Sequence, residues 1–318
     1  MSELRWNPIL EEWVVTATHR QERPHRPDDQ CPFCPGSGKV PDQYDVYIYP
    51  NDFPSFSTPP PNPTIEGSDF YRVEKSFGQC DVVLYHPEHT KTLAELPLEH
   101  IRLLIGLWQR RFRELATRPE VNYVLIFENK GDVIGVTIPH PHGQIYAFPF
   151  IPPKVQKRID SAEKHYKEKK ECLFCHILSE EKKDGRRIVT QNGSWIAFVP
   201  FFARFPYEVH ILPKTHVASI DALEKDQVID LAQMLKTTLS KYDGLFGFSL
   251  PYMMLMYPAP TDGREYPHIH FSIEFLPLHR AKDKLKYLAG CETGAGTFIN
   301  DVSAEEKARE LREVAVSL

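Results

Sequence analysis

The feature that most constrains this chain is an internal repeat, in which cysteines, apolar strands and histidines occur twice in the same order. The first copy begins with Cys-Pro-Phe-Cys at 31–34 and ends with His-Pro-His-Gly-Gln at 140–144. The second begins with Cys-Leu-Phe-Cys at 172–175 and ends with His-Ile-His-Phe-Ser-Ile-Glu at 268–274. Small differences in spacing between the copies belong in loops, so the order indicates a duplicated unit.

Each copy has the same elements between these landmarks. Apolar residues at helical spacing predict one helix around 101–112 and another around 228–239. Apolar runs at 123–127 and 252–256 predict strands that precede the histidine segments. We therefore expect an α+β fold with antiparallel sheets. A last helix is expected to open at Ser303 and to run to the end of the chain.

Length and charge set the class of protein. The chain has 318 residues, enough for two packed halves, which we place at 1–155 and 165–318. A net charge of -5 argues against a protein that grips nucleic acid through a general positive field. No stretch approaches the ~20 apolar residues of a membrane span. The N-terminus lacks a signal-peptide pattern, so we expect a cytoplasmic protein without membrane or nucleic-acid partners.

Four of the six cysteines form the two Cys-x-x-Cys pairs. In a cytoplasmic protein such pairs are metal ligands or redox couples more often than structural disulfides. A redox couple is expected singly in a thioredoxin-like context, so two pairs outside that context favour zinc. Zinc takes four nitrogen or sulfur ligands, and the repeat offers one set in each half. The sets are Cys31, Cys34, His89 and His140, and Cys172, Cys175, His216 and His270.

Both predicted zinc sites are structural, because each set already has four ligands and leaves no open coordination position. A metal in the first half would fix His140 and the strand that follows it. In the second half, His268 competes with His270 as the fourth ligand. The alternative for that half is a vestigial thiol pair beside core histidines.

The His-Pro-His-Gly-Gln segment has the pattern of a reactive site. On an extended strand His140, His142 and Gln144 share one face, while Pro141 and Gly143 face the other side and permit close packing. A neutral imidazole is a good nucleophile toward phosphorus and can carry a nucleotidyl group. Gln144 can donate to a phosphoryl oxygen but cannot shuttle a proton. The alternative is a solvated polar strand.

The second half carries Ser272 and Glu274 at the positions of His142 and Gln144, so we expect chemistry in the first half only. An anionic substrate also needs local positive charge on an acidic protein. The segment 18–26 supplies three arginines just before the first cysteine pair, and arginine forks suit phosphate. A solvated arm is the alternative for this segment.

At these residues the sequence resembles the galactose-1-phosphate uridylyltransferase family, the transferase branch of the histidine-triad superfamily. The similarity covers nearly the whole chain. It is carried by the segments 5–8, 12–15, 31–34, 51–54, 87–93 and 127–131 and, most specifically, by His-Pro-His-Gly-Gln-Ile at 140–145. The resemblance implies two histidine-triad-like halves and a homodimer in which both subunits line each active site.

The resemblance also implies the reaction of a UDP-glucose–hexose-1-phosphate uridylyltransferase. His142 would attack the α-phosphorus of UDP-glucose, release glucose 1-phosphate and hold UMP until galactose 1-phosphate accepts it. Gln144 would hold a phosphoryl oxygen. The positions that match substrate-binding residues of the family are Arg20, Arg23, Asn51, Asp52, Asn129, Lys286 and Glu292.

The sequence departs from the family in two places. Some members bind iron through a glutamate and three histidines, and the matching positions here are Arg158, Tyr257, Ser272 and Glu274, so no iron is expected. A glutamine that helps to recognise the hexose is replaced near Phe298, in a segment that resembles nucleotide-sugar phosphorylases. One alternative is therefore a phosphorylase that transfers AMP from ADP-glucose or a dinucleoside polyphosphate to phosphate. A non-enzymatic zinc protein is the other.

Overall fold

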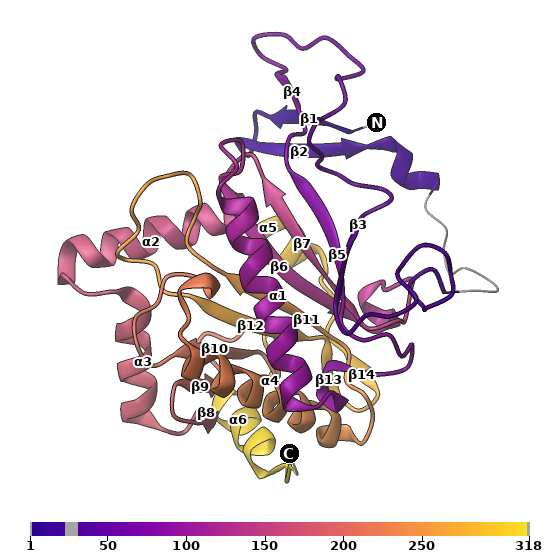
Figure 1. Ribbon diagram of the computed structural model, residues 1–318. Coiled ribbons are helices and arrows are strands. Elements are labelled where there is room, and N and C mark those ends of the chain that lie inside the picture. Colours follow the sequence, from indigo (N-terminus) through magenta and orange to yellow (C-terminus); the bar gives the residue numbers. More distant parts are fainter. Residues whose placement is uncertain (1, 23–30, 317–318) are drawn as a thin grey trace.

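The computed structural model describes residues 2–22 and 31–316. Its centre is a nine-stranded antiparallel sheet to which both halves of the chain contribute (Figure 1). Across the sheet the order is β3 (Tyr47–Pro50), β5 (Gln79–Leu84), β7 (His142–Phe148), β6 (Tyr123–Lys130), β11 (Tyr252–Tyr257), β12 (Ser272–Pro277), β10 (Val209–Pro213), β9 (Trp195–Phe198) and β8 (Ile188–Gln191). The predicted α+β class is therefore confirmed.

The two halves meet at the centre of this sheet. There β6 pairs with β11, from Ile126 opposite Met256 to Lys130 opposite Tyr252. On one side of this pair the strands continue as β7 and β5, and on the other side as β12 and β10. The repeated sequence order thus becomes two copies of one strand arrangement. The His-x-Gln residues lie on β7 and their counterparts lie on β12.

Two long helices pack against each other on one side of the sheet. These are α1 (Leu98–Ala116) and α4 (Lys225–Phe246), and they carry the apolar stripes that the helical spacing predicted. Together with the sheet they enclose one continuous core that includes Trp108, Leu235 and Ile273. Alternate residues of β7 and β12 belong to that core, so the remaining residues of these strands point to the opposite face of the sheet.

The other elements surround this unit. A small sheet is formed by β1 (Ser2–Asn7), β2 (Glu12–Ala17) and β4 (Val73–Lys75). The halves are joined by α2 (Pro153–Lys169) and α3 (Leu173–Asp184), and β13 (His279–Ala281), β14 (Lys284–Leu285) and α5 (Gly290–Ala295) precede α6 (Ala304–Glu313). Short 3₁₀ turns are η1 (Thr18–Glu22), η2 (Leu93–Glu95), η3 (Asp132–Ile134) and η4 (Ile220–Ala222). Within the described ranges, every helix is too short or too polar to cross a bilayer.

The last helix is shorter than the sequence analysis predicted. It opens as expected, with the Ser303 hydroxyl accepting a hydrogen bond from the Glu306 amide at 3.2 Å. It ends at Glu313 instead of running to the end of the chain. The buried Lys241 ammonium donates to the carbonyl oxygens of residues 311, 312 and 314 at 2.7–3.1 Å. A cation at a helix C-terminus satisfies the last carbonyls, and this explains why α6 stops there.

Candidate active site and metal clusters

His142 is the first residue of β7, at the point where a loop enters the sheet. Along this strand His142 and Gln144 are half-buried on one face, whereas Gly143 and Ile145 are buried on the other. The Nδ1 proton of His142 is donated to the His140 carbonyl oxygen at 2.7 Å. A carbonyl can only accept, so this bond fixes the tautomer and leaves the lone pair of the imidazole on Nε2.

Gly143 lets a tyrosine pack directly beneath the strand that carries His142. A Cβ atom added at Gly143 would lie 2.1 Å from the Tyr85 hydroxyl oxygen and 3.0 Å from the Phe127 carbonyl oxygen. Tyr85 is fully buried, so it has no room to move away. The close approach predicted for Gly143 therefore exists, and its partner is a side chain of the residue that follows β5.

His142 borders a cavity of about 460 Å³. Its walls come from β6, from the loop between β6 and β7, and from the segment before η2. Polar residues that line it besides His142 are Lys91, Thr92, Glu128, Asn129, Lys130, Asp132, His140, Ser249 and His279. Two lysines in the lining of a cavity that His142 also borders make this cavity suited to an anionic, phosphate-bearing ligand.

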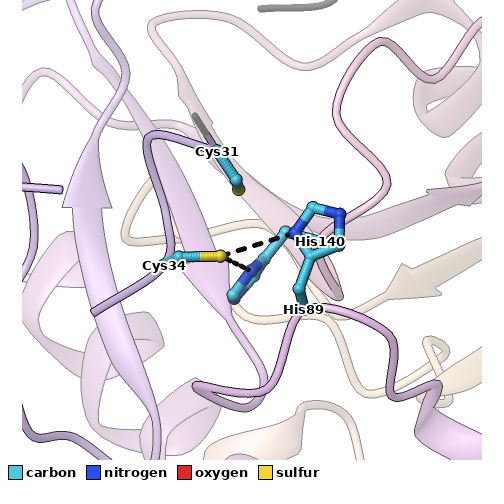
Figure 2. Close-up of side chains that lie close together, drawn as sticks. All are labelled: Cys31, Cys34, His89 and His140. Atoms are coloured by element: carbon cyan, nitrogen blue, oxygen red, sulfur yellow. Dashed lines mark hydrogen bonds between the residues drawn. The ribbon is translucent and has the colours of Figure 1, made fainter. Parts of the chain in front are cut away.

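The first predicted zinc set comes together beside the active strand (Figure 2). The Cys34 sulfur lies 3.5 Å from Nδ1 of His89 and 3.6 Å from Nδ1 of His140, and Cys31 completes the group. His140 lies just before β7 and is buried, with its Nε2 proton donated to the His86 carbonyl oxygen at 2.8 Å. Its Nδ1 lone pair consequently faces the sulfur, as a zinc ligand requires.

The second set repeats this arrangement. Cys172, Cys175, His216 and His270 form one group, in which the Cys175 sulfur lies 3.5 Å from Nδ1 of His216 and 3.4 Å from Nδ1 of His270. Nε2 of His270 donates to a backbone carbonyl, that of Pro213, at 3.0 Å. Of the two candidates for the fourth position, His270 is in the group, whereas His268 lies outside it against two tyrosine rings.

Burial sets the protonation of both groups. It lowers the pKa of His140 and that of His270 to about 4, so both rings are neutral at physiological pH. It raises the pKa of the Cys31 thiol to about 11 and that of Cys175 to about 12. A bound cation reverses the effect on thiols, and metal uptake would therefore release protons. Two sulfurs and two imidazoles fit Zn²⁺ in each half.

β12, the counterpart of β7 in the second half, is covered by ion pairs. Ser272 and Glu274 are both 1% exposed. Arg158 forms an ion pair with Glu274, donates to the Ser272 hydroxyl at 2.9 Å and lies 4.0 Å above the Tyr257 ring. Although burial opposes ionisation, Arg158 and the cations around it lower the pKa of Glu274 to about 2. His210 and Arg204 also lie against this carboxylate.

The predicted substrate residues fall into separate places. Asn129 lines the cavity beside His142. The guanidinium of Arg20 donates to the Phe53 carbonyl oxygen at 2.9 Å, which brings η1 against the segment that carries Asn51 and Asp52. The Asp52 carboxylate accepts from Lys39 at 2.8 Å.

Two further predicted positions, Lys286 and Glu292, stand apart from the cavity. Lys286 and Glu292 pair with each other at 3.1 Å, and neither belongs to the described lining of the cavity at His142. Both lie in the segment that follows β14. Arg23 lies outside the residues that the structure describes.

Several residues of the site were not predicted from the sequence. The Tyr44 hydroxyl lies 3.1 Å from Nε2 of His140, and the Phe33 ring contacts both His140 and His142, with centroids 6.1 and 5.7 Å away. Phe33 could have been found from its place inside the first Cys-x-x-Cys pair. Tyr44 carries no signal in its spacing, because it reaches His140 only through the folding of a loop.

Comparisons with known proteins cover almost the whole chain. Two family profiles match, described as the N-terminal domain of galactose-1-phosphate uridyl transferase over residues 1–152 and its C-terminal domain over 158–317. A curated galactose-1-phosphate uridylyltransferase from Thermotoga maritima is 42% identical over 320 residues, with 100% of each chain covered. A solved uridylyltransferase structure aligns with a TM-score of 0.90 at 36% identity over 98% of each chain. An ADP-glucose phosphorylase from Arabidopsis thaliana aligns with a TM-score of 0.77 at 26% identity over 100% of each.

Proposed function

The chain belongs to the galactose-1-phosphate uridylyltransferase family, and we propose from this premise that it transfers UMP from UDP-glucose to galactose 1-phosphate through an adduct on His142. One observation carries the assignment of the nucleophile. The His140 carbonyl accepts the Nδ1 proton of His142, so Nε2 of a ring that borders the phosphate-suited cavity has the lone pair. A neutral, oriented imidazole is what attack on phosphorus requires.

In the first half-reaction, Nε2 of His142 forms a bond to the α-phosphorus of UDP-glucose. The bond from that phosphorus to the bridging oxygen breaks, and glucose 1-phosphate leaves with the electron pair. Charge that develops on the phosphoryl oxygens is stabilised by donors placed before the reaction. Gln144 supplies an amide for this role from the same face of β7, two residues along the strand.

In the second half-reaction, a phosphate oxygen of galactose 1-phosphate attacks the uridylyl phosphorus. The bond to Nε2 breaks and the electron pair returns to the ring of His142, which restores the enzyme and releases UDP-galactose. Because the acceptor is already an anion, no base is needed to activate it. Gln144 cannot remove a proton from water, and this favours transfer over hydrolysis.

Each Cys₂His₂ group would hold one zinc ion through its two thiolates and two Nδ1 atoms, and the metal would contribute rigidity to the chain around it. In the first half this rigidity reaches the nucleophile, since His140 is both a member of the group and the acceptor for His142. We propose that zinc loads both groups and that the protein works in the cytoplasm.

We also propose that the active protein is a homodimer. Lys286 and Glu292 match positions that contact the hexose phosphate in the family, yet the described lining of the cavity at His142 does not include them. A second copy that brings this segment to the cavity would complete the hexose-phosphate site. The remaining substrate contacts are assigned to Arg20, Arg23, Asn51, Asp52 and Asn129.

The mass of the intact protein after incubation with UDP-glucose, without acceptor and without acid, tests the proposal. Phosphoramidates are acid-labile, so the conditions must be mild. We expect an adduct of the mass of UMP that disappears when galactose 1-phosphate is added. If neither UDP-glucose nor ADP-glucose gives an adduct, covalent nucleotidyl transfer is refuted.

A phosphorylase that acts on ADP-glucose is the second candidate, since a protein of that activity shares the fold at 26% identity. It would use the same nucleophile with inorganic phosphate as acceptor. The same experiment separates the two, because an adduct of the mass of AMP that phosphate discharges would identify the phosphorylase.

A further inference from the structure

We propose a third metal site, formed by His165, Glu171 and His176 at the corner between α2 and α3. The site lies outside both Cys₂His₂ groups and takes no part in the chemistry at His142. Its three ligand atoms lie within 4.8 Å of one another. The ligand class is a divalent transition-metal ion such as Zn²⁺, because two imidazoles and a carboxylate are its common protein partners.

The local fold brings the three side chains together. His165 is on the last turns of α2, and the chain then reverses at Lys170, whose φ of 60° is left-handed. Glu171 lies in this reversal, and His176 is on the first turns of α3. The Glu171 carboxylate accepts a hydrogen bond from Nδ1 of His176 at 2.5 Å and lies 3.7 Å from Nε2 of His165. One carboxylate therefore faces a ring nitrogen from each helix.

The relative position of the two rings matches that of the histidine pairs in the Cys₂His₂ groups. The centroids of His165 and His176 are 5.2 Å apart with an interplanar angle of 69°. The pair of His216 and His270 has the same values, 5.2 Å and 69°, and the pair of His89 and His140 has 5.5 Å and 69°. All three pairs are edge-to-face, an arrangement that is compatible with two imidazoles that direct a nitrogen at one common ion.

His165 provides a second, independent observation. Its Nε2 atom is buried and has no hydrogen-bond partner among the described residues, since the Glu171 carboxylate at 3.7 Å is beyond hydrogen-bonding distance. A buried polar nitrogen without a partner is costly and calls for an explanation. A metal ion between Nε2 and the carboxylate would give this nitrogen a partner, and Nδ1 of His176, which donates its proton to Glu171 in the metal-free arrangement, would release that proton on metal uptake.

The donor set defines how this site differs from the other two. It has three protein ligands and no sulfur, and Glu171 and His176 are 47% and 44% exposed, so water would complete the coordination. We expect weaker and more readily exchanged metal than in the Cys₂His₂ groups. A bound ion would clamp the end of α2 to the start of α3, next to Cys172 and Cys175 in the chain.

Calorimetric titration with Zn²⁺ tests the site in the full-length enzyme whose Cys₂His₂ groups have first been loaded with zinc and freed of excess metal. We expect one further zinc equivalent per chain in the parent protein. His165→Ala and Glu171→Gln should each weaken this binding at least about tenfold. Glu168→Gln is the matched control, because Glu168 is an exposed carboxylate on α2, the helix that carries His165, and lies outside the cluster. This variant should bind Zn²⁺ like the parent.

A Co²⁺ titration of the same zinc-loaded protein reports the ligand type independently of affinity. Cobalt bound by nitrogen and oxygen should give d–d bands without the sulfur-to-metal charge-transfer band of a thiolate site. Uridylyl transfer should stay unchanged in both site variants. The proposal is wrong if the parent takes up no further metal, if His165→Ala and His176→Ala both keep it, or if the extra cobalt shows a thiolate band.

Discussion

The two halves of this protein share one strand arrangement and one type of Cys₂His₂ group, but they differ at the strand beside that group. In the first half, β7 presents His142 and Gln144, both half-buried, and His142 borders a cavity. In the second half, β12 presents Ser272 and Glu274, both 1% exposed and tied to Arg158. The same scaffold therefore holds the imidazole that we propose as nucleophile in one half and a buried carboxylate paired with arginine in the other.

The difference shows what the active half requires beyond its scaffold. The nucleophile needs a fixed tautomer, which the His140 carbonyl provides, and open space beside it. On β12 the second half has neither, because a serine stands at the position of the histidine and Arg158, from α2, lies against Ser272 and the Tyr257 ring. A metal group alone does not make a site, since both halves have one.

The largest expected effect is a loss of transfer activity on replacing His142 of β7, which the equivalent replacement on β12 should not cause. His142→Gly should reduce uridylyl transfer at least about 10⁴-fold, because it removes the imidazole that would carry the adduct. Ser272→Ala, at the equivalent position, should keep transfer within about twofold of the parent. Steady-state rates and intact-protein mass measure both, with zinc content and circular dichroism as controls for folding. Transfer that survives His142→Gly would disprove the nucleophile assignment.

The second prediction concerns the stability of the inactive half. Glu274→Gln removes the buried carboxylate that compensates Arg158, whose side chain is 21% exposed, so we expect a loss of about 3 kcal/mol, the lower end of the range for buried pairs, in the free energy of unfolding at neutral pH. The folded pKa of Glu274 is about 2, below the ordinary 4.5, so the carboxylate stabilises fully above pH 4.5 and progressively less as the pH falls toward 2.

Urea denaturation at pH 7 and at pH 3 measures the free energy of unfolding of the parent and of Glu274→Gln. The difference between the two proteins should be smaller at pH 3 than at pH 7. Glu163→Gln is the control, because its carboxylate forms an exposed pair with Lys167 and its loss should leave the urea midpoint unchanged. An equal difference at both pH values would show that ionisation of Glu274 is not the cause.

The third prediction compares the two metal groups. Cys34→Ser and Cys175→Ser each remove one thiolate ligand, and each should lower the zinc content. Only Cys34→Ser should lower the rate of transfer strongly, about 10- to 100-fold, because Cys34 contacts His140 and His140 holds His142. Metal analysis and steady-state rates on the two variants test this. Equal losses of activity would show that the metal groups act only through global stability.

The arrangement that the two halves share could be predicted in part from the sequence. The order of Cys-x-x-Cys, histidine and strand was enough to predict the α+β class, because a duplicated pattern constrains both halves at once. The set His89 and His140 with Cys31 and Cys34 was also predictable, since ligand types at repeated spacing have few other uses. His140 was predicted on the strand, yet β7 begins only at His142.

The contacts that the sequence did not indicate depend on tertiary folding. Tyr85 reaches Gly143, and Tyr44 reaches His140, from segments that are distant along the chain. Arg158 was matched to the family's iron position, but its pairing with Glu274 follows only from the path of α2 across the sheet. A side chain that acts across elements leaves no periodic signal in the sequence.

The fourth prediction tests the packing beneath the nucleophile. Gly143→Ala should destabilise the protein by about 1–3 kcal/mol and slow transfer, because the new methyl group would overlap the Tyr85 hydroxyl. The double variant Gly143→Ala with Tyr85→Phe should recover part of both losses. In the second half, Ile273 fills the equivalent core position, so Ile273→Val should cost about 0.5–1.5 kcal/mol without slowing transfer. Failure of the double variant to recover would place the strain elsewhere.

The smallest expected effect concerns Gln144, whose counterpart Glu274 is an ionised carboxylate held by Arg158. Neither residue can activate water beside His142. Gln144 cannot because its amide does not titrate, and Glu274 cannot because it lies in the other half. Gln144→His would add a group whose pKa is near neutrality, and it should raise hydrolysis of the uridylyl adduct at least about tenfold. Release of UMP without acceptor measures this, with Gln144→Asn as the control. An unchanged rate would mean that water is excluded from the adduct by the cavity itself and not by the chemistry of Gln144.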